Sequence, residues 1–149
     1  MSAGHASPGS SPADSGSARL RHERDEIDRT VRKVLDAMAR LGYSEASRFA
    51  VRLAMEEAIS NAFRHGHRDL APGEPILVEW TATEADLCIE VEDRGPGFNP
   101  GAVPDPTLDQ NLEIPSGRGL MLMRAYMTSI SFNPPGNRVT MRYRKPAKR

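Results

Sequence analysis

The sequence predicts an α+β fold, a two-layer sandwich in which helices cover a mixed, mainly antiparallel sheet. In the first half of the foldable chain, apolar residues recur with helical spacing; beyond it they alternate as in strands. Short connections join the alternating segments, which favours antiparallel pairing. Antiparallel pairs with the helices gathered together are typical of two packed layers.

Two helices are expected first. Apolar residues keep helical spacing from Ile27 to Leu41, and Gly42 follows where glycine commonly ends a helix. Ser44 is a suitable N-cap for a second helix, which we expect to run to about His65. His65 and His67 lie near its end, where we interpret them as cations that favour the helix dipole.

The later elements follow from the change of period. Residues 76–82 and 87–91 alternate and are joined by four residues, so they form an antiparallel pair. A third helix is expected from Gly119 to Met127, with Met121, Met123 and Met127 in the core. Two further strands are expected around residues 130–132 and 139–143, joined by a tight turn at 133–137.

The remaining segments read as tails and a loop. Residues 1–18 hold almost no large apolar side chain, which predicts a disordered tail ahead of one domain at 19–145. Residues 146–149 form a basic tail. Residues 99–116 show no periodicity and contain several prolines, and a structureless loop of that length is usually a functional lid.

Composition excludes several classes. The formal net charge is zero, so no direct nucleic-acid partner is indicated. The single cysteine, Cys88, permits no disulfide framework and no cysteine metal site. No apolar run approaches the ~20 residues that span a bilayer, and the N-terminus lacks the apolar core of a signal peptide. We therefore expect a cytoplasmic protein without a membrane partner.

The polar pair Glu57 and Asn61 lies within an otherwise apolar helix. Four residues apart, they share the face that runs through Ala50, Leu53 and Ala54. An unpaired polar group there costs a few kcal/mol, so something polar must meet them. Asn61 can ligate Mg²⁺, and Glu57 can take a proton from an attacking hydroxyl. The alternative is that both cap neighbouring backbone groups.

Two glycine-rich turns follow. Asp93 ends a strand and can accept a hydrogen bond from an exocyclic amine such as that of adenine. Gly95 and Gly97 lack the Cβ atoms that would block a flat purine, although a plain strand-ending turn would look similar. Further on, Gly117-Arg118-Gly119 opens the third helix, where backbone N–H groups bind phosphate. Arg118 reaches a phosphate or forms an exposed ion pair.

Together these motifs resemble the GHKL ATPase superfamily. Residues 54–66 resemble its N box, 93–98 its first glycine box and 116–123 its second. The Asn-Ala-x-x-His-Gly pattern of the N box is most similar to that of the bacterial anti-sigma-factor serine kinases. The similarity covers roughly residues 27 to 145, and three boxes in the expected order make it specific.

The resemblance implies a Bergerat-type sandwich that binds ATP with Mg²⁺. It places the catalytic base at Glu57, the Mg²⁺ ligand at Asn61 and the adenine contact at Asp93. A lid formed by residues 99–116 would cover the pocket. The other nucleotide-binding residues that it implies are Gly95, Gly97, Gly117, Arg118, Gly119 and Leu120.

The resemblance also implies partners. Such a kinase phosphorylates a serine of a STAS-domain anti-anti-sigma protein, and in its ATP-bound form it sequesters a sigma factor. A homodimer would use the sheet edge, for which residues 18–21 alone offer the strand that the family places before its first helix. Residues 128–129 are Thr-Ser where the family commonly has an acidic pair.

Other functions remain as alternatives. A non-catalytic ATP-dependent binding module would sequester a partner without phosphotransfer, but it has no need of a base at Glu57. The catalytic half of a histidine kinase needs a helical pair with a phosphoacceptor histidine, and His5 and His22 lie in polar sequence. A chaperone or mismatch-repair ATPase needs a long second domain.

Overall fold

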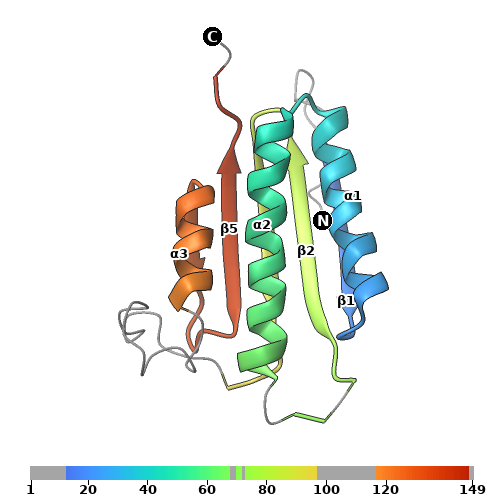
Figure 1. Ribbon diagram of the computed structural model, residues 1–149, viewed down its shortest axis with the longest axis vertical. Helices are drawn as coiled ribbons and strands as arrows, with labels where there is room; N and C mark the ends of the chain where they lie inside the picture. The colour runs from blue at the N-terminus through green and yellow to red at the C-terminus, as the bar shows by residue number, and fades with distance from the viewer. Residues whose placement is uncertain (1–12, 68–69, 72, 97–116, 148–149) are drawn as a thin grey trace.

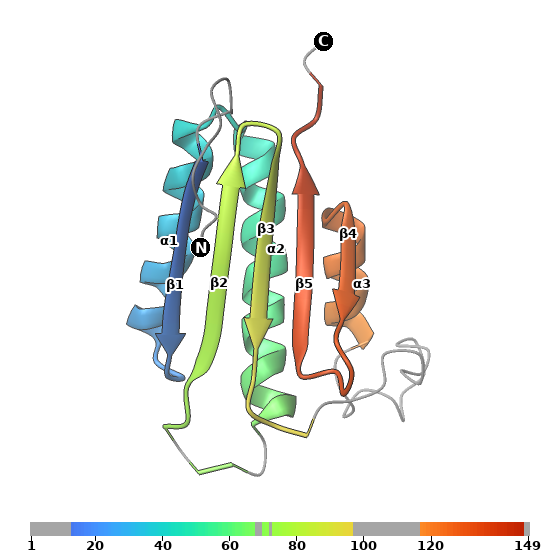
Figure 2. The same cartoon turned by 180° about the vertical axis from the view of Figure 1, so that it is seen from behind.

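The computed structural model describes residues 13–67, 70–71, 73–96 and 117–147. Three helices form one layer over a five-stranded sheet (Figures 1 and 2), which confirms the predicted two-layer α+β fold. No helix in the described residues is long and apolar enough to cross a membrane. The elements are, in order, β1 (Ala13–Leu20), α1 (Arg24–Arg40), α2 (Glu45–Asn61), the π-helical turn η2 (Ala62–Gly66), β2 (Ile76–Thr83), β3 (Asp86–Glu92), α3 (Gly117–Tyr126), β4 (Ser129–Phe132) and β5 (Arg138–Arg144).

The strand order in the sheet is β1-β2-β3-β5-β4. Every neighbouring pair among these strands is antiparallel, so the mixed pairing allowed by the prediction is absent from the described sheet. Short turns join β2 to β3 and β4 to β5, which favours antiparallel pairing of these neighbours. In Figure 2, β3 lies at the centre and runs toward the lower end of the molecule.

The core fills the space between the two layers. Alternate residues of β2 and β3 point toward the helices and are buried, and α2 buries a broad face over the middle of the sheet (Figure 1). The fully buried side chains include Val51, Met55, Ile59, Val78, Leu87, Ile89 and Met141. Met123 and Met127 are buried as predicted, whereas Met121 is 55% exposed. On a ten-residue helix only one face can reach the sheet, and Met121 lies outside it.

Strand β1 corrects the predicted disordered tail. Ala13–Leu20 pair with Ile76–Thr83 along their whole length, although the sequence analysis assigned residues up to 18 to the tail. Small polar side chains do not prevent this pairing, because the backbone groups of β2 provide the hydrogen bonds. Gly16 lies opposite Trp80, and a Cβ on Gly16 would come within 2.7 Å of the indole ring. Residues 1–12 lie outside the described residues.

Two residues, Gly42 and Ser44, determine where α1 ends and where α2 begins. Gly42 has a φ of +88°, which favours glycine just after α1, as predicted. The Ser44 side chain accepts a hydrogen bond from the Ser47 N–H at 3.1 Å and so caps α2. Tyr143 of β5 donates a 2.7 Å hydrogen bond to the Ser47 hydroxyl. These bonds anchor the start of α2 on the sheet, and α2 carries the polar pair.

Candidate functional site

The candidate site forms where α2, through η2, and β3 both end. The two ends lie near the lower edge of Figure 1, and α3 begins on the same side. The α-helix itself ends at Asn61 and a π-helical turn replaces its predicted continuation to His65. π-Helical segments occur frequently at functional sites because they shift the helix face by part of a turn.

Two glycines bring the chain segments into contact around Asp93. A Cβ on Gly66 would lie 2.3 Å from the Asp93 carboxyl carbon, and a Cβ on Gly95 would lie 1.8 Å from the Gly66 carbonyl oxygen. Real Cβ atoms essentially never approach so closely, and both obstacles include backbone or a fixed carboxylate. Glycine is therefore required at both positions by contacts within the chain, whereas the predicted role of Gly95 beside a purine stays a prediction.

The Asp93 carboxylate is fixed but only partly paired. Its Oδ1 accepts a 2.7 Å hydrogen bond from the Gly95 N–H, and its backbone is held on both sides by Asn137. Burial raises the pKa of the Asp93 carboxyl, and the Gly95 N–H opposes that shift. Within the described chain, nothing donates to Oδ2. A half-buried carboxylate with an oxygen that accepts no hydrogen bond from the described residues is suited to accept one from an exocyclic amine.

The side-chain oxygen of Asn61 is in an unusual environment. Its Oδ1 is buried and has no hydrogen-bond partner among the described residues. A buried acceptor without a partner costs about 1–3 kcal/mol and is rare in native structures. A neutral amide oxygen is a ligand that Mg²⁺ accepts, so the residue fits the metal that the resemblance implies. The alternative in which this oxygen caps the backbone is not observed.

Glu57 lies one turn before Asn61 on α2 and is half-buried. Its carboxylate makes no hydrogen bond or ion pair with the described part of the chain. A general base must be free to take a proton, and a capping role would have left such a bond. The geometry is therefore compatible with the predicted base.

His67 was not predicted as a site residue. Its ring forms hydrogen bonds with two other segments of the chain. Its Nε2 lies 2.8 Å from the Arg94 nitrogen, and its Nδ1 lies 3.1 Å from the Glu74 carbonyl oxygen. The ring is 9% exposed. No local sequence signal could reveal this, because Arg94 is 27 residues away.

The second glycine box is described only in part. Gly117, Arg118 and Gly119 form the first turn of α3, as predicted. The Leu120 side chain is 6% exposed and packs in the core, which leaves its backbone as the group that can face a ligand. Gly97 and the predicted lid at residues 99–116 lie outside the described residues.

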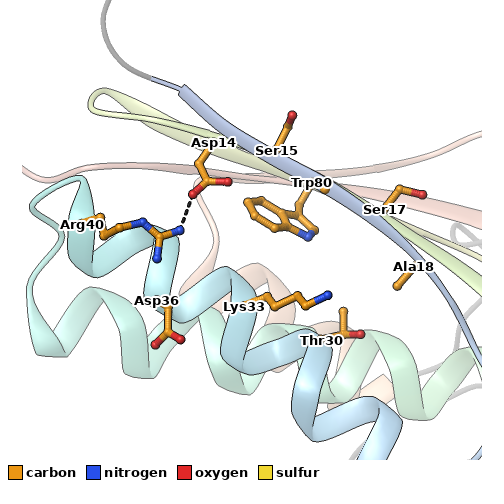
Figure 3. A pocket seen from close by; sticks show the side chains of 10 residues that line it. Asp14, Ser15, Ser17, Ala18, Thr30, Lys33, Asp36, Arg40 and Trp80 are labelled. Atoms are coloured by element: carbon orange, nitrogen blue, oxygen red, sulfur yellow. Dashed lines mark hydrogen bonds and ion pairs between the residues drawn. The ribbon is translucent and has the colours of Figure 1, made fainter.

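A cavity of 290 Å³ lies elsewhere, between α1 and β1 (Figure 3). Trp80 forms one wall, and none of the predicted site residues lines it. The charged groups balance, because Asp14 and Asp36 oppose Lys33 and Arg40, and Asp14 is paired with Arg40. The cavity exists because the inward-facing residues of β1 are small, and it is separate from the site around Asp93.

Comparison with known proteins gives one family match. The model of the histidine kinase-like ATPase domain matches residues 21–143, which include every described element except β1 and the last residue of β5. The match covers all of the predicted site residues. It also covers His67, Gly66 and Asn137, which the structure adds to the site.

Curated proteins that are similar to the chain include two bacterial kinases. The serine/threonine-protein kinase BtrW of Bordetella bronchiseptica is 30% identical over 94 residues, 60% of this chain and 64% of that protein. The serine-protein kinase RsbW of Oceanobacillus iheyensis is 31% identical over 100 residues, 63% of each chain. The chain thus spans less than two thirds of the length of either relative.

Proposed function

The chain belongs to the family of histidine kinase-like ATPase domains, and we propose that it is an ATP-dependent protein kinase that acts on serine. The observation that supports this most directly is the buried Oδ1 of Asn61, which has no partner among the described residues. Beside it on α2, Glu57 is free of hydrogen bonds and ion pairs in the described chain. A magnesium ligand and a free base on one helix face suit phosphoryl transfer.

Adenine recognition is assigned to Asp93. Its Oδ2 accepts a hydrogen bond from the exocyclic amine, while Oδ1 stays bonded to the Gly95 N–H. Gly66 and Gly95 allow the backbone to close around the carboxylate without side-chain atoms. Guanine carries a carbonyl oxygen at the corresponding ring position and would face the carboxylate with a second acceptor. We therefore propose that the site prefers ATP to GTP.

Phosphoryl transfer follows from the placement of Glu57. When bound, ATP with Mg²⁺ would supply the γ-phosphoryl group. The bond between the γ-phosphorus and the β–γ bridging oxygen breaks, and that oxygen remains on the product ADP. Glu57 accepts the proton of the serine hydroxyl while the serine oxygen bonds to phosphorus. Asn61 would hold the metal through its amide oxygen. Gly117, Arg118 and Gly119 would offer N–H groups and a cation to the phosphates.

The substrate that we propose is a serine of a small STAS-domain antagonist, in a partner-switching system in the cytoplasm. The support is that both relatives described above are named as kinases that act on serine. The proposal includes sequestration of a sigma factor by the ATP-bound form and a homodimer through β1. Strand β1 lies at the edge of the sheet and so has one unpaired side in the described chain.

Radiolabel transfer from γ-labelled ATP to a co-purified or genomically adjacent STAS protein tests this function. Glu57→Gln should abolish labelling, a loss of about 10²–10⁴ in rate, and leave ATP affinity within about threefold. Glu56→Gln, the same change one residue earlier on α2, is the matched control and should label normally.

Three outcomes decide between the functions. Labelling that disappears only in Glu57→Gln supports the kinase. Tight ATP binding without labelling of any STAS candidate favours the non-catalytic binding module that sequesters a partner. If millimolar ATP with Mg²⁺ neither binds nor raises the melting temperature, the nucleotide site itself is wrong.

A further inference from the structure

The His67 ring connects two segments that flank the candidate nucleotide site. Because the Arg94 N–H can only donate, Nε2 at 2.8 Å is the acceptor. The Glu74 carbonyl can only accept, so Nδ1 at 3.1 Å carries the proton and donates to it. Both ring nitrogens are thus engaged, and the two bonds together define the neutral imidazole with its proton on Nδ1.

The ring itself is held in place from several sides. The His67 backbone N–H donates to the Ala62 carbonyl at 3.0 Å, across the π-helical turn. The Phe63 ring lies edge-on to the imidazole at 5.8 Å, and His22 stacks on Phe63 at 4.6 Å. With 9% of its surface exposed, the imidazole has little freedom to turn. A fixed ring can determine the position of what it binds.

Arg94 is the residue that the ring positions. It stands between Asp93, whose carboxylate is assigned to adenine, and Gly95, whose N–H holds that carboxylate at 2.7 Å. The Arg94 guanidinium also pairs with Glu74 at 2.9 Å, but 60% of the Arg94 side chain is exposed and such pairs contribute little. Of the two contacts that hold Arg94, the hydrogen bond that its N–H donates to the buried imidazole is therefore the stronger, and it adds to the bonds by which Asn137 holds the Asp93 backbone.

We propose that His67 is a positioning residue that fixes the turn at residues 93–95 and thereby orients the Asp93 carboxylate toward adenine. The assignment of adenine rests on the proposed function, whereas the restraint on the turn does not. Loss of the Nε2 acceptor would leave the Arg94 N–H unpaired and free the turn to shift. The Gly95 N–H would then no longer hold Asp93 in one orientation.

The test compares His67→Phe with His67→Gln in the full chain. Phenylalanine keeps a ring against Phe63 but provides no acceptor, while the glutamine Oε1 can reach the place of Nε2 and accept from Arg94. His22→Leu is the matched control, because His22 stacks on the same Phe63 but makes no bond to the turn. Each variant is measured for Arg94 amide hydrogen exchange without nucleotide, and for ATP and GTP affinity.

In His67→Phe we expect Arg94 amide exchange to be faster by roughly tenfold or more, and ATP affinity to fall by roughly tenfold. His67→Gln should restore both to within about threefold, and His22→Leu should change neither by more than that. Unchanged Arg94 exchange in His67→Phe overturns the proposal. So does a His22→Leu effect of equal size, because it would indicate a general loss of packing.

Failure of the two ideas is distinguishable. If the unaltered protein binds no ATP, the proposed function fails, and Arg94 exchange in the three variants still decides whether His67 fixes the turn. If the unaltered protein binds ATP and His67→Phe loosens the turn without weakening ATP, His67 does not orient the adenine contact. If His67→Phe has a lowered melting temperature, His67→Gln decides the question, because it restores the acceptor for the Arg94 N–H.

Discussion

Replacing Asn61 with leucine should stabilise the protein and destroy its function at once. The side chains are similar in size, and Asn61 Oδ1 is buried without a partner among the described residues. Removing such an acceptor recovers about 1–3 kcal/mol. Leucine is also the better helix former at the last residue of α2, by a few tenths of a kcal/mol. We therefore expect Asn61→Leu to unfold at a higher temperature without nucleotide.

The size of the shift follows from the chain length. At roughly 4 °C per kcal/mol for a domain of this size, the melting temperature should rise by about 4–12 °C. Thermal melts followed by circular dichroism, without nucleotide or metal, measure this. Titration calorimetry should show in parallel that ATP with Mg²⁺ binds the variant far more weakly, because the metal ligand is gone.

Asn137→Leu is the control of opposite sign. Its amide nitrogen donates to the Asp93 carbonyl at 3.1 Å, and its oxygen accepts from Asn133 at 3.0 Å. The same substitution there leaves bonded groups without partners, so the melting temperature should fall. A lower melting temperature in Asn61→Leu would refute the reasoning, since it would mean that the Asn61 oxygen already stabilises the nucleotide-free protein.

The remaining predictions concern the turn after β3. Asp93→Asn should weaken ATP more than GTP in parallel calorimetric titrations, because the amide can present a donor to the exocyclic amine; equal losses would remove Asp93 from that role. Burial raises the pKa of Asp93 in the folded state, so its contribution to stability is present at low pH and is lost as the pH rises. Without nucleotide, Asp93→Asn should thus be the more stable protein at pH 7, with an advantage that shrinks toward pH 3.8, the ordinary value, in melts across that range. Gly95→Ala should lower the melting temperature and abolish ATP binding, because its Cβ would lie 1.8 Å from the Gly66 carbonyl oxygen; a variant with normal stability would mean that the two segments are not in contact.

The helices were predictable because their signals are local. Gly42 and Ser44 lie within two residues of the helix ends that they determine. In β2 and β3, buried apolar residues alternate with more exposed ones along the sequence itself. Strand β1 has no such signal, since its side chains are small and polar. It forms because β2 offers a row of backbone partners and because Gly16 lets the Trp80 indole lie against it. The partner residues in β2 lie 56 to 70 positions away in the sequence.

The candidate site likewise contains residues that local motifs indicate and residues that only the contacts in the fold reveal. Motif spacing was enough to propose Glu57, Asn61 and Asp93, because each residue type has a chemical role that its position suggests, and these roles stay predictions. The supporting residues were not selected. Gly66 was considered only as the end of the second helix and as the last residue of the N-box resemblance, and His67 was predicted only to favour the helix dipole. Their actual roles depend on contacts with Asp93 and Arg94, which no local pattern encodes.

Two features of the nucleotide-free protein would favour binding of the proposed ligand. The Asn61 side chain has a buried oxygen without a partner among the described residues. Burial raises the pKa of the Asp93 carboxyl, which means that burial disfavours its charged form. Both lower the stability of the nucleotide-free protein. A ligand that satisfies them binds only the folded state and stabilises it by about 2.7 kcal/mol at a hundredfold excess over Kd. This is of the same order as the ~1–3 kcal/mol that the unpaired Asn61 oxygen costs. The melting temperature of the unaltered protein should therefore depend strongly on ATP with Mg²⁺, and that of Asn61→Leu should be high and almost independent of it.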